Sequence, residues 1–259
     1  MYKRLPKEIL ENLIYVKNGN IKCFVHKPSP DGDDDGIDDD AFFKLLLMLG
    51  VIDKFLSTIE EVQVAISSKS DFIQKVCFDV VDEATGKSFE PTCPVTKIYD
   101  MTVFYIIPVF NTSEGFAALK VTNDLMKRMN VSVNDLHAYA KLNTPKFFPP
   151  VVSVLLSSSI TTAMKNYEKA WSVTTNGGMN GGISILYDEV LTRLKTEGGC
   201  GLVIYPVSIN EIYICAYNVR SDMKAASEAF YELTSTQTER LSNNIYDYDG
   251  GLNVISIAD

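Results

Sequence analysis

Seven aspartates stand within ten residues in the segment DGDDDGIDDD, at positions 31–40. Asp31, Asp33 and Asp35 have the spacing of the first ligands of an EF-hand calcium loop. The twelfth position of such a loop should be a glutamate that closes the coordination shell, and here it is Phe42. We therefore expect a solvated loop whose last aspartates cap the helix that follows. Weak calcium binding through the three aspartates is the alternative.

A glycine-rich segment, TNGGMNGG at positions 175–182, could cradle a phosphate with its backbone amides. A phosphate loop with this glycine spacing continues into a lysine, and here the next residues are Ile183 and Ser184. Asparagine followed by glycine is common in tight turns, because both residues tolerate a positive φ. The segment therefore predicts a structural turn, with a ligand loop as the alternative.

His137 is one of only two histidines, and it lies on an expected helix beside apolar positions. We expect it to be partly buried and bonded to the backbone, with a general base as the alternative. The sequence has no nucleophile elbow that such a base could serve. Five scattered cysteines, never spaced as C-x-x-C, suggest neither a disulfide framework nor a zinc site, and they fit a reducing cytoplasm. We expect no catalytic residues, no cofactor and no resident metal.

Asparagines recur through the second half of the chain, and their amides can donate and accept hydrogen bonds without ionising. This chemistry suits the recognition of a polar ligand or a peptide, and it suits helix caps and turns equally well. The set consists of Asn123, Asn143, Asn176, Asn180 and Asn210.

Composition excludes several classes of partner. The 259 residues carry a net charge of −9, of which the aspartate run alone supplies seven charges, so the rest of the chain is close to neutral. An acidic mimic of DNA would spread its carboxylates over the fold, and a nucleic-acid binder would need a basic stripe. The apolar runs are much shorter than a membrane-spanning helix, and the first residues do not resemble an export signal. We expect a cytoplasmic protein that binds neither nucleic acid nor membrane.

The elements that must position these residues alternate between helical and strand patterns. The patterns predict an α+β fold, with mixed sheets, packed helices and a possible division into two lobes, an α/β lobe over 1–148 and an α+β lobe over 149–259. Expected helices cover residues 6–16, 41–56, 122–129, 132–145, 187–198 and 222–236. Expected strands cover 21–27, 62–66, 75–82, 101–110, 171–175, 183–186, 201–208, 211–218 and 252–258, with turns at 83–87 and 176–182.

Four blocks of the second half carry a resemblance: VTNDLMKRMNVSVNDLHAYAKLNTPKFFPP, TTNGGMNGGISILYDEVL, GLVIYPVSINEIYI and NNIYDYD. In these blocks, from about Thr102 to the end, the chain resembles an uncharacterised bacterial family, domain of unknown function family 5688, which is frequent on mobile elements. The layout is also distantly similar to uncharacterised family 1444. The resemblance implies an α+β fold and no activity.

The resemblance also maps recurring positions onto this sequence: Asn123, His137, Asn143, Thr144, Pro145, Pro149, Asn176, Asn180, Tyr187, Pro206 and Glu211. Family members often read serine-x-histidine-glutamate where this chain reads Ser208, Ile209, Asn210 and Glu211. A histidine base at that position is therefore not available to this protein. The candidate ligand-binding residues are Asn123, His137, Asn143, Asn176, Asn180, Tyr187, Ser208, Asn210 and Glu211.

We expect a non-enzymatic module that binds or regulates another protein and that is carried by a bacterium, a phage or a mobile element. This expectation depends on the missing catalytic motifs, on the apolar helix over 41–56, and on the aromatic tail with Tyr246 and Tyr248. A homo-oligomer is possible. The alternative is a sensor or enzyme for a nucleotide or metabolite that uses the asparagine-rich blocks.

Overall fold

The chain has an α+β fold, as the sequence predicts. The structure is a computed structural model that describes residues 13–17, 20–22, 60–112, 115–155, 167, 169–178, 180–199, 201–217, 223–235 and 240–255. It divides into two compact units whose segments alternate along the chain. The first unit contains Met1–Phe78, Phe89–Thr96 and Phe104–Phe147, and the second contains Asp79–Ser88, Lys97–Val103 and Phe148–Asp259.

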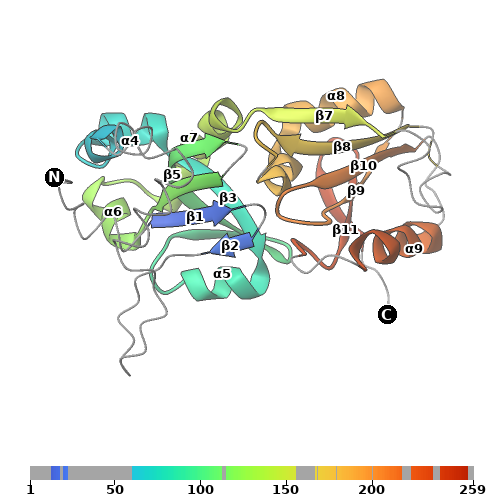
Figure 1. Ribbon diagram of the computed structural model, residues 1–259, viewed down its shortest axis with the longest axis horizontal. Helices are drawn as coiled ribbons and strands as arrows, with labels where there is room; N and C mark the ends of the chain where they lie inside the picture. The colour runs from blue at the N-terminus through green and yellow to red at the C-terminus, as the bar shows by residue number, and fades with distance from the viewer. Residues whose placement is uncertain are drawn as a thin grey trace. The chain divides into compact units, whose positions relative to one another are not determined.

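Residues 13–147 supply one sheet and four labelled helices (Figure 1). The sheet has the order β2-β1-β6-β5-β3, and β4 pairs with β5 beside this path. Its strands are β1 (Leu13–Lys17), β2 (Asn20–Lys22), β3 (Cys77–Asp82), β4 (Val95–Ile98), β5 (Met101–Thr112) and β6 (Gly115–Lys120). The helices are α4 (Lys69–Lys75), α5 (Glu83–Phe89), α6 (Asn123–Arg128) and α7 (Val133–Phe147).

Strand β5 is buried on both faces over residues 101–109, as its unbroken apolar sequence predicts. Pro108 lies in the middle of this strand and cannot donate a ladder hydrogen bond. The register with β6 shifts between Pro108 and Phe110, so the strand accommodates the proline at a bulge.

Two of the helix starts that the sequence predicts, at Thr122 and Ser132, have the expected caps. Thr122 accepts a hydrogen bond from the amide of Leu125 at the start of α6. Ser132 and Asp135 bond each other's amides at the start of α7. The expected end of α7 at Pro145 is wrong by about half a turn, because the proline lies inside the last turn and the helix continues to Phe147.

The second unit is built on a six-stranded sheet of order β12-β11-β9-β10-β8-β7. Every pair in this sheet is antiparallel. The strands are β7 (Pro150–Val154), β8 (Lys169–Thr175), β9 (Gly201–Tyr205), β10 (Ile212–Tyr217), β11 (Ile245–Tyr248) and β12 (Leu252–Ile255). The expected pairing of the strands now named β9 and β10 is confirmed. Strand β11 was not expected.

Helices cover the two faces of this sheet. Helix α8 (Asp188–Gly198) and the 3-10 helix η2 (Gly181–Leu186) pack on the face of Trp171 and Ala216. Helix α9 (Met223–Thr234) packs on the opposite face, where its Phe230 joins a core with Tyr205 and Cys215. Figure 1 shows α8 and α9 separated by the strands. The expected helices over 187–198 and 222–236 correspond to these two.

Four further local expectations about described residues are wrong. Residues 13–17 form strand β1 where a helix was expected, because their pairing with β6 outweighs local propensity. Residues 62–66 are helical up to residue 65, with Val62 and Ala65 buried one turn apart. The expected turn at 83–87 is helix α5. Asp82 caps the start of this helix, because its carboxylate accepts a hydrogen bond from the amide of Thr85. The expected strand at 183–186 belongs to η2.

Two predictions fall on parts of the chain that the structure does not describe. The aspartate run with Asp31, Asp33 and Asp35 and the apolar helix over 41–56 both lie outside the described residues. Among the helices that the structure does describe, none combines the length and the apolar character that a membrane span needs. The placement of the lobe boundary at 148/149 stays a prediction.

Candidate functional site

The glycine-rich segment packs against the turn that precedes β10, and both belong to the second unit. The amide of Asn180 donates to the side-chain oxygen of Asn210 at 3.1 Å. The next two amides, of Gly181 and Gly182, donate to the carbonyls of Asn210 and Ile209 at 3.1 and 2.9 Å. Two segments of the predicted site, which are 30 residues apart, are therefore joined by their backbones.

Close backbone contact explains why this segment needs glycine. A Cβ atom at Gly181 would lie 2.0 Å from the carbonyl oxygen of Asn210. The amides of Asn176 and Gly178 donate to the carbonyls of Pro149 and Thr175. Five amides of the segment, counted over its described residues, are therefore bonded inside the protein, and this favours the predicted structural turn over a phosphate cradle.

Ser208 and Glu211 form the turn that starts β10. The Ser208 hydroxyl accepts hydrogen bonds from the amides of Asn210 and Glu211, both at 3.1 Å. The Glu211 carboxylate in turn accepts a hydrogen bond from the Ser172 hydroxyl of β8. Burial, followed by the charge and the hydrogen bond of Glu211, raises the pKa of Tyr213 to about 12. Glu211 is therefore held by two hydroxyl groups on one face of the sheet.

The register of the sheet shows what lies beside Glu211. Ser153 of β7, Ser172 of β8 and Tyr213 of β10 are direct cross-strand partners, so their side chains share one face. By the same register Val151 pairs with Thr174. This cluster, which we call the Glu211 shelf, consists of Val151, Ser153, Ser172, Thr174, Glu211 and Tyr213. It lies on the face that carries α9, next to the core under that helix.

The remaining second-unit candidates are engaged in the fold. Tyr187 is buried and donates from its hydroxyl to the carbonyl of Phe148 at 3.0 Å. Asn176 is exposed, and Asn180 is buried with a left-handed backbone (φ 56°). Asn180, Ser208, Asn210 and Glu211 form one hydrogen-bonded group, and their role in ligand binding stays a prediction.

Three candidates belong to the first unit. The buried Asn143 donates from its side-chain amide to the carbonyls of Ile73 and Val76, at 2.9 and 3.0 Å. It thereby satisfies the end of helix α4. Asn123 is the first residue of α6, and its backbone amide donates to the carbonyl of Thr92.

His137 is half-buried on α7, as predicted, but its described partner is a side chain. The Tyr105 hydroxyl lies 3.2 Å from Nδ1 of His137 and 2.7 Å from the Thr96 hydroxyl. Burial, and then the charge of Lys141, lowers the pKa of His137. The described cysteines, Cys77, Cys93 and Cys215, are all buried. Within the described part of the chain, no group of three or more potential ligands could hold a metal ion.

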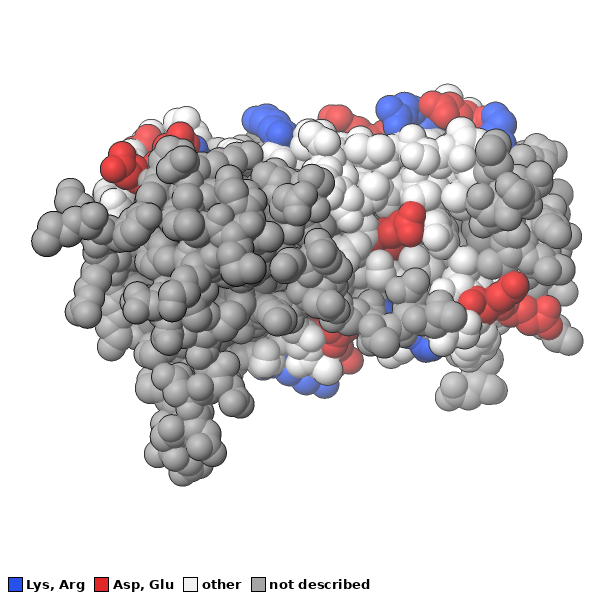
Figure 2. Space-filling view, viewed as in Figure 1, with Lys and Arg blue, Asp and Glu red and all other residues white. Residues whose placement is uncertain are grey.

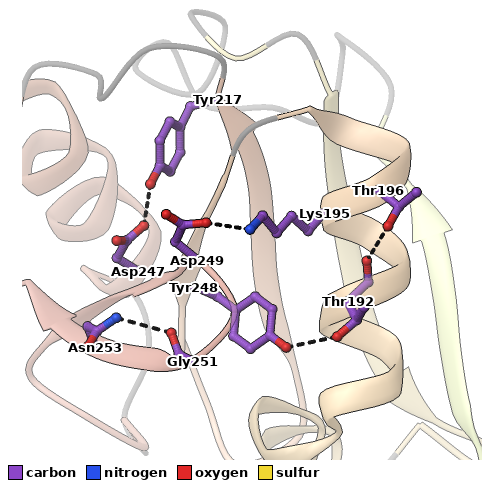
Figure 3. Close-up of polar contacts among 9 residues, drawn as sticks. All are labelled: Thr192, Lys195, Thr196, Tyr217, Asp247, Tyr248, Asp249, Gly251 and Asn253. Atoms are coloured by element: carbon purple, nitrogen blue, oxygen red, sulfur yellow. Dashed lines mark hydrogen bonds and ion pairs between the residues drawn. The ribbon is translucent and has the colours of Figure 1, made fainter.

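The aromatic tail is used inside the second unit. Tyr246 and Tyr248 are only 0% and 4% exposed. Figure 3 shows Tyr248 and Asp249 directed at helix α8, where they bond Thr192 and Lys195. The expectation that these two tyrosines supply a contact surface is therefore wrong, because both are buried: Tyr248 bonds α8 through Thr192, and Tyr246 bonds Ser242 and Asp100.

The model of one protein family, the family of unknown function DUF5688, matches residues 49–250. The chain belongs to this family. The match includes the Glu211 shelf, both glycine pairs and the α6–α7 pair, and it begins well before the region in which the sequence alone suggested the resemblance. Searches of curated proteins and of solved structures found no match. The likeness to family 1444 stays a prediction.

Sequence reasoning missed Ser153, Ser172 and Tyr213. A partial signal was available for Ser153 and Tyr213, because the positions that alternate with them in β7 and β10 are apolar; β8 gives a weaker signal for Ser172, because its alternating positions include Lys169 and Thr175. The pairing that aligns them into one row is not visible in the sequence, because it depends on the register between β7, β8 and β10.

Proposed function

We propose that this protein is a protein-binding module that receives an extended segment of its partner along the outer edge of β7. The supporting observation is the position of β7 at the end of its sheet, where it pairs with β8 on one side and with no described strand on the other. An unpaired strand edge is a template for a further strand.

Backbone geometry identifies the groups that this edge offers. The amide of Leu155 donates to the carbonyl of Ala170, so Leu155 directs its backbone toward β8. Backbone groups alternate in direction along an antiparallel strand, and Val151 and Ser153 therefore also direct theirs toward β8. The N–H and C=O groups of Val152 and Val154 point to the outer edge.

The composition of β7 supports this role. The strand PVVSV contains no charged residue, and its Val151 and Val154 side chains are 41% and 69% exposed. Natural edge strands are usually protected from pairing by charges, prolines or bulges. Here Pro150 stands only at the start of the strand, so the outward donors of Val152 and Val154 stay available for pairing.

The alternative of a nucleotide or metabolite sensor draws less support from the geometry. Such a sensor would use the asparagine-rich blocks, and most of their polar groups are bonded within the fold. The cytoplasmic setting and the link to phages or mobile elements stay predictions from the sequence.

A pair of proline substitutions tests the edge. Val152→Pro removes an outward donor and no bond to β8, so the variant should fold but lose its binding. Ser153→Pro removes an inward donor and should lower the melting temperature by several degrees. Peptides selected from a random display library against the wild-type protein supply the binding assay. Selected peptides that bind Val152→Pro as tightly as the wild type would contradict the proposal.

A further inference from the structure

We infer that the segment received by β7 carries a lysine or arginine whose charged group pairs with Glu211; this inference rests on the proposed function. The carboxylate of Glu211 is bonded to the hydroxyls of Ser172 and Tyr213, which are neutral. None of the ion pairs among the described residues includes Glu211. A carboxylate has about four acceptor positions, so two neutral donors leave room for a cation.

A row of two small side chains, which we call the serine row, lies between the edge of β7 and this carboxylate. Ser153 is exposed and Ser172 is its direct partner, so two of the smallest polar side chains lie in one row between the edge and Glu211. Val151 lies beside the serine row on the same face, and its larger side chain offers an apolar contact to a side chain that lies along the row. A residue that an added strand places opposite Ser153 would direct its side chain onto this face.

The distance between an added strand and the Glu211 carboxylate determines how long the partner's side chain must be. Strands in a sheet are about 4.8 Å apart, so a strand added beyond β7 lies about 10 Å from β8, where Ser172 holds the Glu211 carboxylate. An ion-pair contact of about 3 Å leaves a distance that only a long side chain covers. Lysine and arginine have this length, and their apolar stems can lie along the serine row.

Charge supports the same occupant. Figure 2 shows a wide surface over β7, β8 and β10 that is largely uncharged and in which one acidic group stands alone. The Glu211 shelf itself contains no lysine or arginine, so among its residues a cation meets no positive charge, and the chain as a whole carries −9. A second copy of the chain does not fit, because its own β7 contains neither lysine nor arginine.

The test uses short acetylated and amidated peptides of alternating threonine and valine with arginine, norleucine or glutamate at the central position. On the wild-type protein, the arginine peptide should bind about tenfold more tightly than the norleucine peptide. Glu211→Gln keeps the shape of the side chain and should remove this preference. The matched control, Glu189→Gln on α8, removes a charge from the opposite face and should leave the preference unchanged. NMR shifts of the Val152 and Val154 amides locate the peptide.

The outcomes separate this inference from the proposed function. Equal binding of the arginine and norleucine peptides, with both lost in Val152→Pro, would overturn the inference and leave the edge proposal standing. Equal weakening of both peptides by Glu211→Gln would also overturn it, because Glu211 would then have only a structural effect. Dimerisation of the wild type that Val152→Pro abolishes would make a second copy the occupant and overturn it as well. If none of the peptides shifts the β7 amides, both proposals fail.

Discussion

The fold shifts the pKa values of two aspartates of the second unit, Asp79 and Asp100, in opposite directions. Burial raises the pKa of Asp79 to about 7, against a hydrogen bond from the amide of Val80. For Asp100, partial burial acts in the same direction, but hydrogen bonds from Tyr246, Ser242 and Asn243 outweigh it and lower the pKa. The fold therefore opposes ionisation of one carboxyl group and favours it at the other.

Replacement of Asp79 by asparagine should stabilise the protein above neutral pH. The pKa of Asp79 is higher in the folded state than the usual 3.8, so the wild type loses stability as the pH rises from about 4 to about 7. Asparagine does not ionise, and the variant should gain about 2 kcal/mol at pH 8, a figure discounted for the partial exposure of the residue, and almost nothing at pH 4. Urea unfolding followed by circular dichroism at both pH values measures this difference.

The matched substitution Asp100→Asn should act in the opposite direction. Its carboxylate contributes stability above pH 3.8, and this contribution is lost as the pH falls through the lowered folded pKa. At pH 8 we expect a loss of about 2 kcal/mol, as is typical of hydrogen bonds to a charged group. A stabilising effect of both substitutions at pH 8 would contradict this account of the two sites.

At the scale of elements, several candidate ligand-binding residues form hydrogen bonds that join one element to another. Asn143 links α7 to the end of α4, and Tyr187 links the start of α8 to the chain before β7. Asn210 joins the turn before β10 to the glycine-rich segment. An asparagine amide suits such joints because it donates and accepts at any pH.

The role of Asn143 predicts a loss of stability on substitution. Asn143→Ala leaves the carbonyl of Ile73 and the buried carbonyl of Val76 without this donor and should cost about 2 kcal/mol. Asn134→Ala on the exposed side of the same helix is the matched control and should change the stability by less than about 0.5 kcal/mol. Chemical denaturation of both variants provides the measurement. If Asn143→Ala were as stable as the control, Asn143 would be free to serve as a ligand residue.

At the scale of the whole molecule, the second unit is not one continuous piece of the chain. Its segments 79–88 and 97–103 precede the main part, which begins at Phe148. The second of these segments supplies Asp100 to Ser242 and Tyr246, and the Tyr99 hydroxyl donates to the carbonyl of Leu252. A lobe that begins at the predicted 148/149 boundary would lack these contacts.

A fragment with residues 149–259 should therefore be much less stable than the whole chain. Without Asp100, the buried hydroxyls of Ser242 and Tyr246 lose a charged acceptor, which is expensive for buried donors. We expect the fragment to melt at least 10 °C below the full chain, or not to fold at all, as measured by circular dichroism. A fragment with the melting temperature of the full chain would show that the segments before Phe148 are dispensable.

Much of the fold could be predicted from short stretches of sequence. The caps at Thr122 and Ser132, the buried strand β5 and helix α8 follow from patterns within about a dozen residues. The errors lie where tertiary pairing opposes the local pattern, as in β1, or where the period was misread, as in the helical residues 62–65. Membership of the α+β class depends on many such elements and tolerates several errors.

The candidate site was predicted less completely. The sequence identified Asn180, Ser208, Asn210 and Glu211, which do lie together, but it grouped them with Asn143, whose side chain is committed to α4. It missed Ser172, because the contact of this serine with Glu211 spans 39 residues.

The amino-acid sequence by itself determined the class of fold, the starts of α6, α7 and α8, the family resemblance and the lack of known catalytic motifs, because each of these is encoded in neighbouring residues. Only the tertiary structure decided that Tyr246 is buried, that Asp100 bonds Ser242 across 142 residues of chain, and that Ser153, Ser172 and Tyr213 form one row. The physical reason is that strand register and sheet order are fixed by packing between distant segments, and a shift of one residue would turn every side chain of a strand to the other face.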